Sequence, residues 1–90
     1  MPALALPSLL THDQAAVCAQ TLAAGIRAEV SDKVVIDGSA LARFDSSALA
    51  VLLQCRREAV ALGKGLTIDG LPAKLRELAA LYGIQSLIEA

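Results

Sequence analysis

Aromatic side chains are almost absent from this sequence of 90 residues, which contains one Phe, one Tyr and no Trp. Proteins that bind single-stranded nucleic acids stack the bases on several aromatic side chains, and this chain lacks such a set. Its 8 Lys and Arg residues are balanced by 9 Asp and Glu residues, and no basic block stands out. Because a basic patch is the usual mark of a nucleic-acid-binding domain, we expect no nucleic-acid partner.

Metal-ligating residues are scarce as well, since Cys18 and Cys55 are the two cysteines and His12 is the one histidine. A structural zinc site takes four Cys or His ligands, so the sequence predicts no such site. We expect no other metal and no cofactor. Both cysteines fall on apolar helical faces, where a thiol is expected to act as a small buried hydrophobe.

Long hydrophobic runs are missing because polar or charged residues interrupt each apolar stretch, as Arg27, Asp37 and Gln54 do. A membrane-spanning helix needs roughly 20 apolar residues, so we expect no direct insertion into a membrane. Residues 1–4 carry no basic segment followed by an apolar one, so no export signal is predicted. The expected location is therefore the cytoplasm.

Small apolar residues and leucine are abundant, with 18 Ala and 16 Leu in a chain that is 56% hydrophobic. Both are strong helix formers, and a chain of this composition folds rather than staying disordered. The length suits one small domain over residues 1–90.

The first half of the chain predicts two strands and a helix. Ala3 to Leu6 is a short apolar run ended by a proline, and Thr11 with Gln14 has the spacing of a capping box that opens a helix over 12–28. The β-branched run Lys33 to Asp37 lacks polar alternation at its centre, which predicts a central strand covered on both faces.

The second half continues the alternation. A loop from Ser39 to Phe44 precedes a predicted helix over 46–62 that ends at Gly63. A strand from Leu66 to Asp69 follows, and Pro72 at the first helical position opens a helix to Tyr82. Residues 84–90 have the spacing of a last helical turn. Alternating strands and helices predict an α/β fold, with the strands at 33–37 and 66–69 parallel.

Three residues, Asp45, Ser46 and Ser47, precede the helix at 46–62 and can each accept a hydrogen bond from its free amides. They are consistent with simple helix caps. They are equally consistent with a hydroxyl exposed at a helix N-terminus, where the free amides and the helix dipole favour an anion such as a phosphate.

The order of these motifs resembles the STAS domain, the module shared by sulfate transporters and anti-sigma factor antagonists. The resemblance covers about residues 33 to 88 and follows an apolar strand ending in Asp37, the turn Asp45-Ser46-Ser47-Ala48-Leu49, the run Pro72 to Leu75, and the run Leu78 to Ile84. It implies a single small α/β domain with helices packed against a short mixed sheet.

Within that family, the runs Leu49 to Leu53 and Leu78 to Gly83 look most like the MlaB subgroup. The resemblance implies a non-catalytic cytoplasmic subunit that binds and supports the ATPase of a phospholipid-transporting ABC system, at the inner membrane through its partner. The alternative is an anti-anti-sigma factor that binds an anti-sigma factor kinase and is switched by phosphorylation at Ser46. The partner-binding or phospho-acceptor residues expected under these interpretations are Phe44, Asp45, Ser46, Ser47, Ala48 and Val51.

Two departures from the family pattern matter. Ala48 stands where the family usually has Gly, so this position is predicted to be helical already. The first arm of the family's opening hairpin has no counterpart, which predicts a bare sheet edge that a second copy or a partner could cover.

Two catalytic interpretations are rejected, and one apolar surface is predicted. Ser46 and His12 are not taken as part of a hydrolytic triad, because the Gly-x-Ser-x-Gly turn that exposes a catalytic serine is absent. Gly63-Lys64-Gly65 is not taken as a phosphate-binding loop, because it lacks the spacing of that motif. On the helix at 46–62 we expect one line of apolar residues along the helix axis to face the core. This helix carries further apolar residues outside that line, and they predict a flat face on which a partner could dock. The buried line is Ala48, Leu52, Cys55 and Ala59; the residues outside it are Ala50, Val51 and Ala61.

Overall fold

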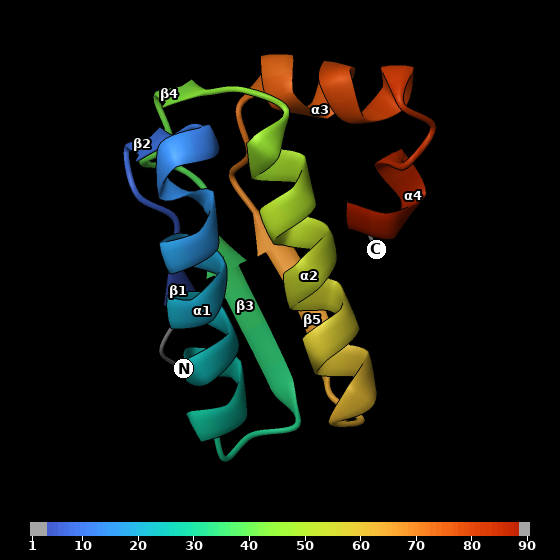
Figure 1. Ribbon diagram of the computed structural model, residues 1–90. Helices are drawn as coiled ribbons and strands as arrows, with labels where there is room; N and C mark the ends of the chain where they lie inside the picture. Colours follow the sequence, from blue (N-terminus) through green and yellow to red (C-terminus); the bar gives the residue numbers. More distant parts are fainter. Residues whose placement is uncertain (1–3, 89–90) are drawn as a thin grey trace.

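The main sheet contains three strands in the order β1-β3-β5, so the predicted strand at 33–37 does lie at its centre. In a computed structural model that describes residues 4–88, these strands are β1 (Leu4–Ala5), β3 (Lys33–Asp37) and β5 (Gly65–Asp69) (Figure 1). Both pairings are parallel, as predicted for β3 and β5. The α/β class is confirmed, and each strand pair in the described chain is parallel.

Two long helices, α1 (His12–Ala28) and α2 (Ser47–Ala61), pack side by side over one face of this sheet (Figure 1). Val34 and Ile36 of β3 are buried beneath them, whereas Val35 on the opposite face is half-buried and its neighbour Thr67 is exposed. The prediction that β3 is covered on both faces is therefore wrong. Side chains alternate along a strand, and the helices of the described chain cover only the face that Val34 and Ile36 share.

A second, two-stranded sheet pairs β2 (Leu9–Leu10) with β4 (Arg43–Phe44) in parallel, although the sequence predicted no strand at either segment. Each strand leads almost directly into a helix, β2 into α1 and β4 into α2. Because the two strands run side by side in the same direction, the N-termini of α1 and α2 lie next to each other (Figure 1). This pairing positions the candidate site.

The predicted helix signals are largely confirmed. The side chain of Gln14 accepts a hydrogen bond from the backbone N–H of Thr11 at 2.9 Å, as the capping box requires. Gly63 has φ +69°, the left-handed conformation that follows a helix end. Pro72 precedes α3 (Ala73–Leu81) as its cap residue, one position earlier than predicted.

The predicted last helical turn is present within residues 84–88 and packs back on the domain, whereas residues 89–90 lie outside the described residues. The last helix, α4 (Gln85–Ile88), buries Ile88, and Arg56 of α2 donates a hydrogen bond to the carbonyl oxygen of Leu87 at 3.3 Å. At the opposite end, the Lys64 ammonium donates to the carbonyl oxygens of Ile26, at 2.7 Å, and Glu29. These contacts fix α2 against both α4 and the C-terminus of α1.

The outer edge of β1 is unpaired within the described residues, because β1 is the first strand of the sheet order. It offers only Leu4 and Ala5 for pairing, and short edge strands discourage edge-to-edge association. Homodimerisation through this edge stays a prediction. In the part of the chain that the structure describes, no helix has the length and hydrophobicity to cross a membrane.

Candidate partner-docking site at the joined helix N-termini

The carboxylate of Asp45 joins the N-termini of α1 and α2. Its Oδ1 atom accepts the backbone N–H of Ser47 at 2.8 Å, and its Oδ2 atom accepts the backbone N–H of His12 at 3.1 Å. The first turns of both helices carry N–H groups with no partner inside the helix. A single side chain thus satisfies one amide of each helix and fixes their relative position.

These hydrogen bonds also set the charge of the site. The hydrogen bond from the backbone of Ser47, with a smaller contribution from His12, holds the pKa of Asp45 below its ordinary value. The carboxylate therefore stays ionised at neutral pH, next to the positive ends of two helix dipoles. Any anion added nearby would share these dipoles but would also meet the charge of Asp45.

Ser46 presents the exposed hydroxyl of this site. Its backbone is already helical, with φ −62° and ψ −16°, its carbonyl oxygen accepts the N–H of Leu49, and its side chain makes no capping hydrogen bond. Asp45 performs the capping instead. Ser47 is half-buried, whereas Ser46 is exposed, so Ser46 presents the more accessible hydroxyl.

Of the three other predicted site residues, one is half-buried and two are buried. Phe44 is half-buried against the core, at the end of β4, and anchors the segment that carries Asp45. Ala48 is 0% exposed and Val51 is 2% exposed, so neither can touch a partner directly. The assignment of Ala48 and Val51 as direct partner contacts is therefore wrong, whereas that of Phe44 stays a prediction. Ala48 lies within α2, as its replacement of the family Gly predicted.

The predicted docking face on α2 is also narrower than expected. Its buried line is confirmed, since Ala48, Leu52, Cys55 and Ala59 are at most 1% exposed. Val51 joins this core because α2 contacts α1, β5 and α4. Of the residues placed outside the buried line, only Ala50 and Ala61 are exposed, and they offer little apolar area.

His12 is the site residue that sequence reasoning missed. It contacts Asp45 through its backbone N–H, so the contact itself does not assemble a hydrolytic triad. The two residues are 33 positions apart, and only the pairing of β2 with β4 reveals their proximity. Within residues 4–88, no group of three or more His, Cys, Asp or Glu side chains is placed to hold a metal ion.

A sequence model of one protein family, described as "Mlab, STAS domain", matches residues 1–89. The chain belongs to the STAS domain family. The match confirms the resemblance found over residues 33–88 and extends it over nearly the whole sequence. No curated protein matches the chain.

Membership of the STAS family makes this domain a protein-interaction module. The platform formed by Asp45, Ser46 and the first turn of α1 fits such a role, because rigid elements hold an exposed polar group at one end of the fold. We call this surface, made by His12, Asp45 and Ser46, the Ser46 platform.

Proposed function

We propose that this STAS domain is a non-catalytic subunit that docks on the ATPase of a phospholipid-transporting ABC system. In this proposal the domain supports assembly and activity of the ATPase and reaches the inner membrane through it. The sequence runs Leu49 to Leu53 and Leu78 to Gly83, and a family description that includes the Mla name, support this assignment.

The observation that carries the proposal is the exposed Ser46 hydroxyl on a rigid platform. Asp45 fixes both helix ends beneath it, and the buried Ala48 and Leu49 seat the first turn of α2 in the core. A partner that binds here meets a preorganised surface and loses little entropy in ordering it. A small neutral hydroxyl also lets the partner approach the helix end closely.

The alternative is an anti-anti-sigma factor that binds an anti-sigma factor kinase and is released when Ser46 is phosphorylated. The same exposed hydroxyl favours this function, because a phosphate of about −1.5 to −2 charges would fit a helix N-terminus without breaking the helix. Next to the ionised Asp45, that phosphate would repel a partner suited to a neutral hydroxyl.

Co-purification tests the leading proposal. The chain would be co-expressed with the ATPase subunit of a phospholipid-transporting ABC system from the same organism, and separately with an anti-sigma factor kinase. A stable complex with the ATPase, and ATP hydrolysis that increases when the domain is added, is the expected result. A complex with the kinase alone, together with a phosphate on Ser46 in mass spectrometry, would replace the proposal by the alternative.

A further inference from the structure

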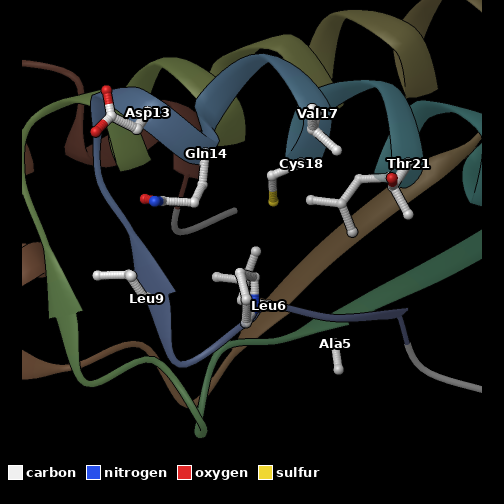
Figure 2. A pocket seen from close by; sticks show the side chains of 10 residues that line it. Ala5, Leu6, Leu9, Asp13, Gln14, Val17, Cys18 and Thr21 are labelled. Atoms are coloured by element: carbon white, nitrogen blue, oxygen red, sulfur yellow. The ribbon is translucent and has the colours of Figure 1, made fainter.

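An apolar groove of about 640 Å³ runs between α1 and the segment that connects β1 to β2 (Figure 2). Leu6 and Leu9 form one wall, and Val17, Cys18 and Leu22 of α1 form the other. Two of these apolar side chains are exposed, since Val17 is 67% exposed and Leu9 is 40% exposed. Exposed apolar side chains that gather around a concavity are typical of a binding surface.

The groove and the Ser46 platform adjoin at the first turn of α1, where Asp13 of the groove follows His12 of the platform. Asp13 lines the end of the groove that lies at the N-terminus of α1. The preceding residue, His12, donates its backbone N–H to Asp45. Leu9 belongs to β2, the strand that pairs with β4 just before Asp45 and Ser46. A partner that contacts Ser46 therefore reaches the groove by extending along the first turn of α1.

The rim of the groove carries a negative charge. The Asp13 side chain lies at the N-terminal end of the groove and forms no ion pair within the described residues (Figure 2). The ionised carboxylate of Asp45 accepts the backbone N–H of His12, the residue that precedes Asp13. An apolar floor with an acidic end is complementary to an apolar side chain flanked by Lys or Arg.

We propose that the partner docked at Ser46 inserts an apolar side chain into this groove and pairs a basic residue with Asp13. This inference rests on the proposed function and names the second contact that the same partner makes. It divides the interface into a polar contact at the Ser46 platform and an apolar anchor beside it, and a buried apolar anchor is a common source of binding energy.

Two valines on the two long helices provide a matched test. Val17 lines the groove and is 67% exposed, whereas Val60, near the C-terminus of α2, is 64% exposed and lies outside the groove. Binding of the ATPase to the variants Val17→Gln and Val60→Gln would be measured by calorimetry. We expect Val17→Gln to weaken binding by about tenfold or more and Val60→Gln to leave it unchanged.

Charge and accessibility give two further readouts. Asp13→Asn should weaken binding a few-fold and reduce its dependence on salt, whereas Asp32→Asn in an exposed turn should do neither.

Cys18 lines the groove, so its alkylation by iodoacetamide should slow by about tenfold or more when the ATPase is bound. Thermal midpoints of all variants would be measured to exclude unfolding.

The outcomes separate the two proposals. If Ser46→Glu weakens binding while Val17→Gln and Cys18 alkylation are unaffected, the groove is not part of the interface and the proposed function stands. If the wild-type chain does not bind the ATPase at all, the proposed function is contradicted and the groove contact falls with it. A homodimer that Val17→Gln dissociates would show that a second copy fills the groove, which also overturns this inference.

Discussion

The carboxylate of Asp45 holds the first turn of α1 through the backbone N–H of His12, 3.1 Å away, although 33 positions separate the two residues. The same carboxylate caps α2 through Ser47 at 2.8 Å. Two helix N-termini thus share one acceptor, and Ser46 lies directly on this junction. Asp45 therefore holds the surface around Ser46 in place, even if a partner contacts only Ser46.

Removing that acceptor should destabilise both helix ends. We expect Asp45→Ala to lower the thermal midpoint by roughly 4–8 °C, because the N–H groups of His12 and Ser47 lose their partner. Asp32→Ala, which removes a carboxylate from an exposed turn, is the matched control and should leave the midpoint unchanged. Equal midpoints for the two variants would contradict the role of Asp45.

The Asp45 carboxyl should also leave a signature in the dependence of stability on pH. Its folded pKa lies below the value of about 3.9 expected for an unfolded Asp, so the unfolded chain binds more protons between the two values. The stabilisation is fully present above about pH 5 and is lost as the pH falls through the folded pKa. Urea unfolding between about pH 2 and pH 6 measures this loss.

In the variant Asp45→Asn the acid-dependent loss should be smaller. It should not vanish, because the pKa of Asp37 is also lowered, chiefly by the hydrogen bond from the backbone N–H of Ser39. An unchanged pH profile would mean that Asp45 is not held ionised by the two helix ends.

Lys64 should contribute to stability as a cap of the other end of α1. Its ammonium donates hydrogen bonds to the carbonyl oxygens of Ile26 and Glu29, and the substitution Lys64→Met removes this donor. We expect a loss of about 1–3 kcal/mol in the free energy of unfolding, measured with urea. Lys74→Met, at an exposed position of α3, is the control, and a similar loss there would contradict the specific role of Lys64.

The two thiols should differ sharply in reactivity. Cys55 is 1% exposed, and burial raises its pKa to about 12, so very little reactive thiolate forms near neutral pH. Cys18 is half-buried, with a pKa that burial also raises. Under native conditions a thiol reagent should therefore modify Cys18 slowly and Cys55 only after unfolding. Rapid modification of Cys55 would mean that the packing between α1 and α2 opens readily.

Local signals in the sequence predicted most of the secondary structure. The capping box at Thr11 and Gln14, the β-branched run of β3 and the left-handed Gly63 each depend on a few neighbouring residues. The strands β2 and β4 were missed because two residues carry no measurable periodicity, and their pairing depends on segments far apart in the chain.

Only the part of the candidate site that depends on neighbouring residues was predicted from the sequence. Asp45 and Ser46 were recognised from helix-start chemistry, whereas His12 entered the site only through tertiary pairing. Val51 was misassigned because the periodicity of one helix does not reveal how many neighbours pack around it. Helix α2 contacts α1, β5 and α4, and this widens its buried stripe to include Val51.

The substitution Ser46→Glu separates the fold from the docking function. A carboxylate at the first turn of α2 suits the helix dipole, so we expect the thermal midpoint to stay within a few degrees of the wild-type value. In contrast, an added charge beside Asp45 should oppose a partner that fits a neutral hydroxyl. Ser46→Ala is the control that removes the hydroxyl without adding charge.

The most direct test of the central claim is therefore the dissociation constant of the ATPase for wild type, Ser46→Ala and Ser46→Glu, measured beside their thermal midpoints. We expect Ser46→Glu to weaken binding by about tenfold or more, and by more than Ser46→Ala does, while all three thermal midpoints remain similar. Wild-type affinity in Ser46→Glu would contradict docking at the Ser46 platform, and parallel losses of affinity and stability would reduce Ser46 to a structural residue.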